Sequence, residues 1–336
     1  MAVVFRDGCD SYGVTADIAR KWQSNTGWVY HATAGRNGGG CLQSVSGTGI
    51  IKSIFGSMNG SEYCYGYWIK CSTTPAAEID HLNLYTTGDA IGGKIRLGTG
   101  GGFHLTNSAN TSTSVTSSNN ICDNNWHWIE IRFKTTGTNT ISIYDNTSLV
   151  LNAVTGNIST STDHISFTGS ANATMTLDDI MVFDDVVGGP VLSSHPLGPR
   201  QITTGRPDGD SAITFVPSTG SLNYALVDEQ TFDSADYVES GTTGDQDLYD
   251  YAAIATTIAS ITDVGLNSVL VNPNPGTINF QNACKSGGNT TLGTSTITPT
   301  TSYVTRQTSY GVDPATSAAW ANIAAINSAQ FGIKVV

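Results

Sequence analysis

The sequence predicts an all-β protein built from two domains, and three observations carry this prediction. Short apolar or alternating runs recur between clusters of Gly, Asn, Ser and Thr, at a spacing typical of a β-sandwich or jelly roll. Charged residues make up only 12% of the chain, about half of the usual ~25%. The 37 glycines and the many Thr, Ser and Asn residues that take their place disfavour helix interiors. The length of 336 residues suggests two domains of ~100–200 residues each, with one large all-β domain as the alternative.

Strands are expected throughout the first two-thirds of the chain, in short runs separated by turns. The predicted strands are residues 50–54, 63–70, 79–85, 94–97, 126–134, 140–144, 149–153, 166–169 and 175–183. The polar tetrapeptide at 145–148 separates two of them and predicts a hairpin. The tract at 99–120 consists almost entirely of Gly, Ser, Thr and Asn, so it is expected to be a long loop or a pair of weak edge strands.

A change of composition at 184–209, where four prolines and several glycines gather, predicts the linker between the two domains. The domains are therefore expected at 1–190 and 195–336. In the second domain the predicted strands are residues 213–216, 221–227, 258–262, 268–271, 277–282, 302–306 and 331–336, with 248–257 ambiguous between strand and helix. Thr316 followed by Trp320, Ile323 and Ile326 at helical spacing predicts one short helix.

The charge of the chain excludes several classes of partner. The formal net charge is −12, with 15 Lys and Arg against 27 Asp and Glu. A nucleic-acid backbone or an anionic membrane surface calls for a basic patch, so neither is an expected partner. The first ten residues show no export signal of the usual kind, and no run approaches the ~20 apolar residues of a membrane-spanning helix.

The six cysteines do not form a zinc-binding pattern, because no CxxC spacing is present. Cys64 and Cys71 fall in one predicted strand, where seven residues at ~3.3 Å each separate them by ~23 Å, too far for a disulfide. Buried free thiols are the expectation for the set, and one or two bridges are the alternative.

Four segments resemble a concanavalin-A-like jelly roll of the laminin-G superfamily. They are Phe5–Asp10, similar to the usual opening strand, Gly35–Leu42, Asn125–Ile131 with its paired tryptophans, and Leu177–Asp184, similar to the final strand. Their order and spacing over residues 1–187 carry the resemblance, and it implies that the first and last strands lie side by side.

The rest of the chain resembles the C-terminal β domain that certain tailed-bacteriophage virion proteins join to such a jelly roll. The segments concerned are 223–229, 237–240, 244–249, 313–320 and 331–335. The resemblance implies a non-enzymatic virion structural protein, a capsid decoration or a tail-associated adhesion component, that is made in the host cytoplasm and exposed on the particle. Its partners would be other virion proteins, and it would be a homo-oligomer or bound to a lattice. The alternative function is a carbohydrate-binding module that recognises host surface glycans.

No catalytic set is expected. Glu78 and Asp80 resemble the start of the E-x-D-x-x-E signature of laminarinase-type glycoside hydrolases, but Leu82 and Asn83 occupy the two positions where the second carboxyl would stand. His127 lies at the start of an apolar strand and is expected to be a buried structural histidine.

Weak binding candidates remain. The aromatic strands offer Trp128 and Tyr65 as a glycan-stacking surface, since the Trp128 side chain should point away from Ile129, while Trp68 and Trp126 are expected in the core. Asp245, Asp247 and Asp250 lack the glycine and distal glutamate of an EF-hand loop, so a solvated acidic turn is expected there.

A calcium site is predicted from the acidic residues of the opening and closing strands. Jelly rolls that open with an acidic strand and close with Asp-Asp-Ile often hold calcium between the two strands, and Asp7 and Asp179 match that pattern. Backbone carbonyls would complete the ~6–8 oxygens that calcium takes. The alternative is a pair of acidic residues at a solvated sheet edge. No other cofactor is expected.

Overall fold

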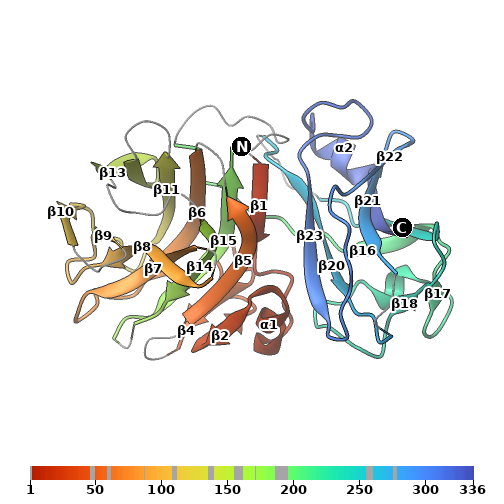
Figure 1. Ribbon diagram of the computed structural model, residues 1–336, viewed down its shortest axis with the longest axis horizontal. Helices are drawn as coiled ribbons and strands as arrows, with labels where there is room; N and C mark the ends of the chain where they lie inside the picture. The colour runs from red at the N-terminus through yellow and green to blue at the C-terminus, as the bar shows by residue number, and fades with distance from the viewer. Residues whose placement is uncertain are drawn as a thin grey trace. The chain divides into compact units, whose positions relative to one another are not determined.

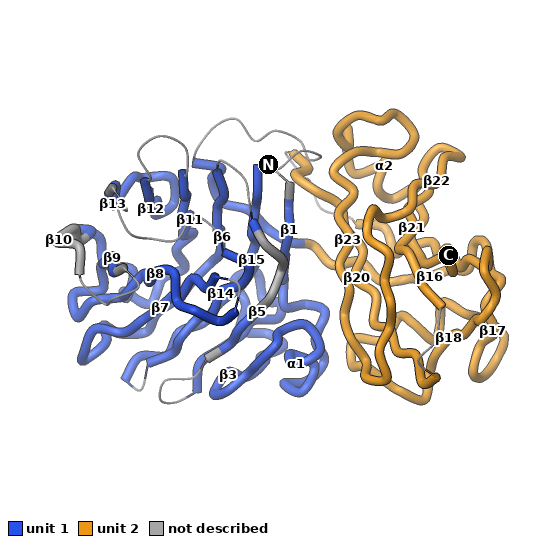
Figure 2. The backbone as a smooth tube through the Cα atoms, viewed as in Figure 1, with its two compact units in different colours: residues 1–202 blue, residues 203–336 orange. Residues whose placement is uncertain are grey.

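A computed structural model of the chain separates into two compact units, Met1–Ile202 and Thr203–Val336 (Figure 2). The structure describes residues 2–45, 50–58, 62–86, 88–107, 112–134, 140–154, 162–170, 172–185, 196–254, 260–274 and 278–336. Of the predicted linker at 184–209, residues 186–195 lie outside these ranges. None of the helices within them is long and apolar enough to span a membrane.

The first unit is a sandwich of two antiparallel sheets (Figure 1). The first sheet runs in the order β13-β12-β11-β6-β15-β4-β3, and β1 also pairs with β15. Its strands are β1 (Ala2–Asp7), β3 (Trp28–His31), β4 (Cys41–Ser44), β6 (Glu62–Cys71), β11 (Trp126–Lys134), β12 (Thr140–Asp145), β13 (Ser148–Val154) and β15 (Met175–Asp184). The pairing of β1 with β15 confirms that the opening and closing strands lie side by side.

The second sheet runs in the order β10-β9-β8-β7-β14-β5-β2. Its strands are β2 (Ser24–Thr26), β5 (Ile50–Met58), β7 (Ile79–Thr86), β8 (Ala90–Leu97), β9 (Phe103–Asn107), β10 (Ser112–Thr116) and β14 (Thr162–Thr168). Strands β9 and β10 form one edge, so the polar tract at 99–120 contains a pair of edge strands rather than only a loop. A short 3-10 helix η1 (Thr15–Asp17) and helix α1 (Ile18–Lys21), which the sequence did not predict, follow β1.

The core of the sandwich lies between the two sheets and contains the inward residues of both. Alternation along β6 and β11 directs Tyr65, Tyr67 and Ile131 inward, where they meet Leu84 and Phe167 of the second sheet. The predicted hairpin between β12 and β13 is confirmed. Asn146 and Thr147 form its two-residue turn with φ angles of 53° and 102°. Two-residue hairpin turns favour such positive φ angles because they match the twist of the flanking strands.

The second unit is also β-rich and has a five-stranded sheet in the order β16-β19-β24-β21-β22, with two further two-stranded pairs, β17-β18 and β20-β23. The strands are β16 (Pro207–Ala212), β17 (Val216–Pro217), β18 (Val238–Glu239), β19 (Gln246–Tyr251), β20 (Val264–Leu270), β21 (Phe280–Ser286), β22 (Asn289–Leu292), β23 (Val304–Tyr310) and β24 (Gln330–Val335). The strand expected at 221–227 is wrong, since this segment contains the 3-10 helix η2 (Tyr224–Leu226). Part of the strand expected at 258–262 lies outside the described residues.

The C-terminal helix α2 (Ile323–Asn327) is shorter than expected and starts later. Its N-cap is Asn322 rather than Thr316, because the Asn322 side chain accepts a hydrogen bond from the backbone N–H of Ala325 at 3.0 Å. The segment before α2 forms a turn, in which the backbone N–H groups of Thr316 and Ser317 donate hydrogen bonds to the carbonyl of Asp313. The turn at 313–317 therefore occupies the residues that the sequence pattern assigned to the first helical turn.

Residues 196–202 belong to the first unit, although the sequence assigned residues 195–202 to the second domain. The segment crosses the outer face of the first sheet. Leu197 and Ile202 pack against a cluster that includes Trp128 and Met181. Its backbone is held by Glu130, whose carboxylate accepts hydrogen bonds from the N–H groups of Leu197 (2.8 Å) and Gly198 (3.1 Å). We call residues 196–202 the strap.

Candidate functional site

The outer face of the second sheet carries a network of five charged or titratable side chains on β7, β8 and β9 and just before β7. Glu78 binds His104 Nδ1 at 2.7 Å with one carboxylate oxygen and Arg96 Nη1 at 2.6 Å with the other. Asp80 binds Arg96 Nε at 2.8 Å and Lys94 Nζ at 2.6 Å. We call these five residues the charged face.

The side chains of the charged face are fixed but still open to solvent. Glu78, Asp80, Arg96 and His104 are each between 24% and 30% exposed. Lys94 and Arg96 alternate along β8 and so share one face of that strand, but their spacing alone does not indicate their partners. His104 lies in the polar tract that was expected to be a long loop or a pair of weak edge strands, and its place beside Arg96 follows from the pairing of β8 with β9.

A β-bulge in β7 determines which of the residues after Asp80 point outward. The register with β8 shifts between Asp80 and Leu82, so His81 and Leu82 both point into the core and Asn83 points outward. Asn83 therefore occupies the position of the second carboxyl in the bulged form of the hydrolase signature. Its amide nitrogen donates to Ser166 at 3.2 Å and Thr168 at 3.3 Å.

Beside the charged face, Tyr85 is held by its neighbours on the same sheet. The Tyr85 ring stacks on His164 with ring centroids 4.6 Å apart and 11° between the planes. Lys52 Nζ lies 4.9 Å from the centroid of the same ring. The Tyr85 ring is therefore already in contact with an imidazole and a cation of its own sheet.

A glycine is required where the chain turns from β8 into β9. The backbone N–H of Gly98 donates to the carbonyl of Gly102, and Gly101 has a φ of +78°. A Cβ atom on Gly98 would lie 2.8 Å from Nε2 of His104. The glycine-rich stretch at 98–102 leads into β9 and offers no helix N-terminus to a phosphate. Its glycine at position 98 instead leaves room for the His104 ring beside the turn.

The glycan-stacking residues predicted from the sequence are not available for stacking in the structure. Trp128 points away from Ile129 as expected, but it is 0% exposed because the strap covers this part of the first sheet. Tyr65 is 1% exposed and lies in the core, where its hydroxyl bonds Thr162. Trp68 is partly covered, and its indole N–H donates to the carbonyl of Arg200 in the strap at 2.7 Å.

The structure does not bring Asp7 and Asp179 into one set of calcium ligands. Asp7 is fully buried and accepts hydrogen bonds from the Tyr12 hydroxyl (2.5 Å), Trp22 Nε1 (2.6 Å) and Lys21 Nζ (3.1 Å). These donors occupy both carboxylate oxygens, so Asp7 is a structural anchor for α1. Among the described residues no three His, Cys, Asp or Glu side chains gather as a metal site.

Asp179 lies where β15 changes neighbour from β4 to β1. Asp178 accepts hydrogen bonds from the backbone N–H groups of Arg36 and Asp179, and Asp179 accepts one from Ile202 and one from the Arg36 side chain. Burial, with the nearby charge of Asp179, raises the pKa of Asp178 to about 7. Burial likewise raises the pKa of Asp179 to about 6. Asp10, not Asp7, is the further carboxylate that acts on both.

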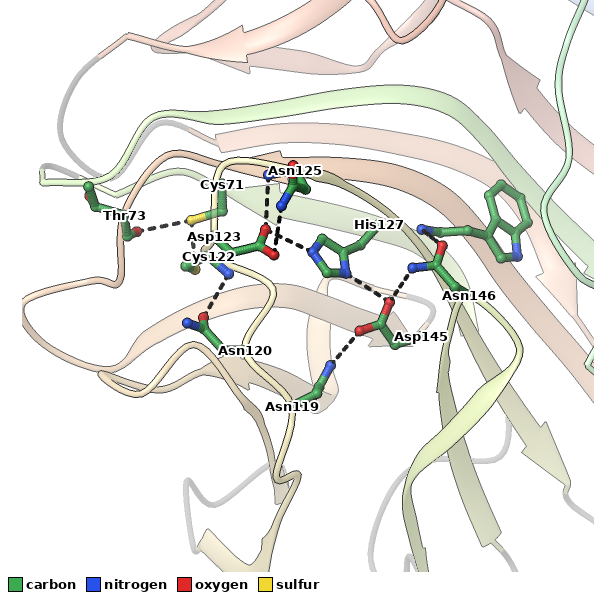
Figure 3. Close-up of polar contacts among 11 residues, drawn as sticks. Cys71, Thr73, Asn119, Asn120, Cys122, Asp123, Asn125, His127, Asp145 and Asn146 are labelled. Carbon is green, nitrogen blue, oxygen red and sulfur yellow. Dashed lines mark hydrogen bonds and ion pairs between the residues drawn. The ribbon is translucent and has the colours of Figure 1, made fainter.

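His127 is structural, as expected, but it lies between two carboxylates rather than in the core (Figure 3). Its Nδ1 is 2.9 Å from Asp145 at the end of β12, and its Nε2 is 3.0 Å from Asp123 in the segment that leads into β11. The hydrogen bond with Asp145 raises the pKa of His127 to about 9, against the opposing effect of burial. At neutral pH the His127 imidazolium therefore forms ion pairs that link the end of β12 to the segment before β11.

These pKa shifts predict that the first unit is more stable at pH 6.5 than at pH 8.5. The raised pKa values of His127 and Asp178 mean that the folded chain binds more protons than the unfolded chain over this range. Stability is therefore lost as the pH rises through about 7 for Asp178 and about 9 for His127. We expect a difference of about 1–3 kcal/mol in the free energy of unfolding, measured by urea denaturation at both pH values.

The variant His127→Gln should lose most of this pH dependence, whereas Asp208→Asn, at an exposed carboxylate of the second unit, should keep it. Equal stability of the wild-type first unit at the two pH values would contradict the assignment of the raised pKa values. Below pH 6.5 the contribution of His127 should level off, and His81, whose pKa burial lowers to about 4, should oppose the further gain from Asp178 and Asp179.

Comparison with known proteins gives distant structural likenesses only. No family model matches the chain, and no curated protein matches it. Three of the similar solved structures are the binding domain of paraclostridial mosquitocidal protein 1, a structure of botulinum neurotoxin type C, whose cell entry depends on interaction with two ganglioside molecules, and the botulinum neurotoxin serotype D ligand-binding domain with N-acetylneuraminic acid.

The identities are 16%, 15% and 18%, and the TM-scores are 0.41, 0.36 and 0.33, in the same order. The matches cover 55%, 48% and 43% of this chain and 49%, 42% and 38% of those chains. The chain thus spans less than half the length of each structure, and no conclusion about a ligand follows from likenesses this distant. The all-β fold itself is shown by the sheets described above.

Proposed function

We propose that the protein is a non-enzymatic carbohydrate-binding module whose ligand lies on the charged face of the second sheet. The observation that carries the proposal is that Glu78, Asp80, Arg96 and His104 are held in place by one another and remain open to solvent. Sugar hydroxyls both donate and accept hydrogen bonds, and oriented carboxylate and guanidinium groups provide acceptors and donors side by side.

The balance of charge supports a neutral polyol as the ligand. Two carboxylates, Glu78 and Asp80, stand against the two permanent cations Lys94 and Arg96, which makes the face neutral in sum apart from His104. A free anion or cation would meet as much repulsion as attraction. A hydroxyl-rich ligand would instead use both kinds of group.

The absence of hydrolysis is part of the same proposal. Retaining glycosidases need two carboxyls ~5–5.5 Å apart, one of them a proton donor. At the outward position of β7 the chain carries Asn83, whose amide cannot act as a general acid and already donates hydrogen bonds to Ser166 and Thr168. Arg96 pairs with Glu78 and Asp80 together, an arrangement that suits binding better than proton transfer.

We predict that Arg96→Gln weakens glycan binding while Arg132→Gln preserves it. Arg96 orients both carboxylates of the charged face, and losing such a charge-assisted contact with a ligand lowers affinity by roughly 10–100-fold. Arg132 is a matched control because it makes a similar two-point ion pair with Glu62, at 2.7 and 2.6 Å, on the first sheet. The measurement is a glycan-array screen followed by calorimetry with the best neutral oligosaccharide.

Two outcomes would remove the proposal. One is a wild-type chain that retains no glycan on the array. The other is equal affinity of Arg96→Gln and wild type for the retained glycan, which would place the ligand elsewhere on the molecule.

The place of this module on a bacteriophage particle, as a capsid decoration or tail component, is a finer proposal that rests on the resemblance of residues 223–335 alone. In that setting the charged face would meet host surface glycans, and other virion proteins would hold the chain in a lattice or a homo-oligomer. The neighbouring genes provide the test, since capsid, portal or tail genes beside this one support a virion role and their absence contradicts it.

A further inference from the structure

Cys71 and Cys122 lie in direct contact at the point where the chain leaves and re-enters the first sheet (Figure 3). Cys71 is the last residue of β6, and Cys122 lies four residues before β11. Their sulfur atoms are 2.7 Å apart. A disulfide bond is about 2.0 Å long, so a shift of less than 1 Å would bring the two sulfurs to bonding distance.

The backbone around the two cysteines is already held in a geometry that favours this approach. The N–H of Asn124 donates to the carbonyl of Cys71 at 3.0 Å, and the N–H of Ile121 donates to the carbonyl of Gly101 at 3.0 Å. The N–H of Cys122 is bound by the Asn120 side chain at 2.8 Å. Bond formation would therefore need side-chain adjustment rather than movement of the segments.

The pair differs from the other cysteine of the same strand. Cys64 lies seven residues before Cys71, so its side chain points to the opposite side of the first sheet. There it packs with Trp128 and Phe183, whereas Cys71 packs in the core between the sheets. Cys64 is therefore a matched control within β6 for any test of Cys71.

We propose that Cys71 and Cys122 form an intramolecular disulfide when the protein reaches an oxidising environment, and that this bond clasps the half of the second sheet that carries the charged face. The closed loop would contain β7, β8, β9 and β10. The disulfide would then covalently join the end of β6 to the segment that leads into β11. This inference does not depend on the ligand proposed above.

The oxidant is a low-molecular-weight disulfide such as oxidised glutathione. Cys122 is the more accessible of the pair, at 6% exposure against 0% for Cys71. The contact with Cys71 and burial raise the pKa of Cys122, so it is the minor thiolate form of Cys122 that attacks the small disulfide, forms a mixed disulfide and releases one small thiol. The Cys71 thiolate then attacks the Cys122 sulfur and releases the second. Two protein thiols are oxidised, one disulfide is reduced to two thiols, and the protons pass to the released thiols.

The test compares the full chain with Cys122→Ala, Cys71→Ala and the control Cys64→Ala after incubation with oxidised glutathione. Thiols are counted by alkylation in denaturant and mass spectrometry. Of the six cysteines in wild type, four should remain free, and one peptide pair should contain Cys71 joined to Cys122. Oxidation should raise the Tm of the first unit by roughly 5–15 °C in wild type and Cys64→Ala, and in neither Cys71→Ala nor Cys122→Ala.

Six free thiols in the oxidised wild type, or a persistent glutathione adduct on Cys122 that Cys71 never displaces, would overturn the proposal. A bond between another pair of cysteines would do so as well. The thiol count and peptide mapping keep the test decisive even if one alanine variant folds poorly, because both are made on the wild-type chain.

Discussion

Replacing Asp247 by alanine should unfold a large fraction of the second unit. Asp247 is 0% exposed, and its carboxylate accepts four hydrogen bonds. One oxygen binds the backbone N–H groups of Thr214 and Phe215, both at 2.8 Å, and the other binds Asn223 Nδ2 at 2.7 Å and the Tyr249 hydroxyl at 2.9 Å. Removing the carboxylate leaves these buried donors without their acceptor, at a cost of about 3–5 kcal/mol.

This cost is large against the ~5–15 kcal/mol that stabilises a typical domain. Hydrogen exchange of peptides from residues 204–336 in the intact chain would measure it, because exchange there should approach the rate of the unfolded state. The variant Asp247→Asn should be intermediate, since an amide keeps one acceptor but turns an N–H towards existing donors.

Asp250→Ala is the matched control, because Asp250 is an exposed residue of the same strand whose side chain accepts one hydrogen bond, from Gln330 at 3.1 Å. Its cost should stay below about 1 kcal/mol. Equal protection of Asp247→Ala and Asp250→Ala against exchange would show that the buried carboxylate is not what holds this part of the sheet.

Asp247 also shows where prediction from the sequence fails. Asp245, Asp247 and Asp250 predicted a solvated acidic turn, which is wrong for Asp247. Strand β19 does alternate between faces, but which of its faces is buried depends on donors that lie 24–33 residues earlier in the chain. Local spacing contains no information about such partners.

The same limit separates the parts of the jelly roll that were predictable from those that were not. Alternation placed Ile129 and Ile131 in the core and Trp128 on the opposite side, and pairing of the end strands followed from the resemblance. The bulge in β7 that turns Asn83 outward has no local signal in the sequence. The charged face depends on the pairing of β7, β8 and β9, so the sequence alone indicates only Glu78 and Asp80.

The strap is a second long-range contact that local composition does not predict, since its backbone donates to Glu130 on β11. Its prolines and glycine predicted a linker, and such residues do prevent regular pairing. They do not prevent a segment from docking irregularly on a sheet, and Glu130 supplies the acceptor that its backbone needs. Protease accessibility in the wild type is accordingly expected after Ile202, at 203–206, rather than within the described strap.

Replacing Glu130 by alanine should release the strap and expose Trp128. Glu130 is 0% exposed, and without its carboxylate the N–H groups of Leu197 and Gly198 lose their acceptor. Leaving these two N–H groups of the docked strap without an acceptor costs about 2–4 kcal/mol, whereas in a released strap they can donate to water. The chain should therefore relieve the cost by undocking, which removes the cover from the indole ring that Leu197 and Ile202 pack against.

Two measurements would detect the release. Tryptophan emission should shift to longer wavelength, and limited proteolysis should gain a cut within 196–202 that the wild type resists. Glu130→Gln should show a smaller effect, because one amide oxygen still accepts, and Glu62→Gln, on the neighbouring strand β6, should leave both readouts unchanged since Glu62 binds Arg132 instead of the strap. Wild-type emission and an unchanged cleavage pattern in Glu130→Ala would mean that apolar packing by Leu197 and Ile202 alone keeps the strap in place.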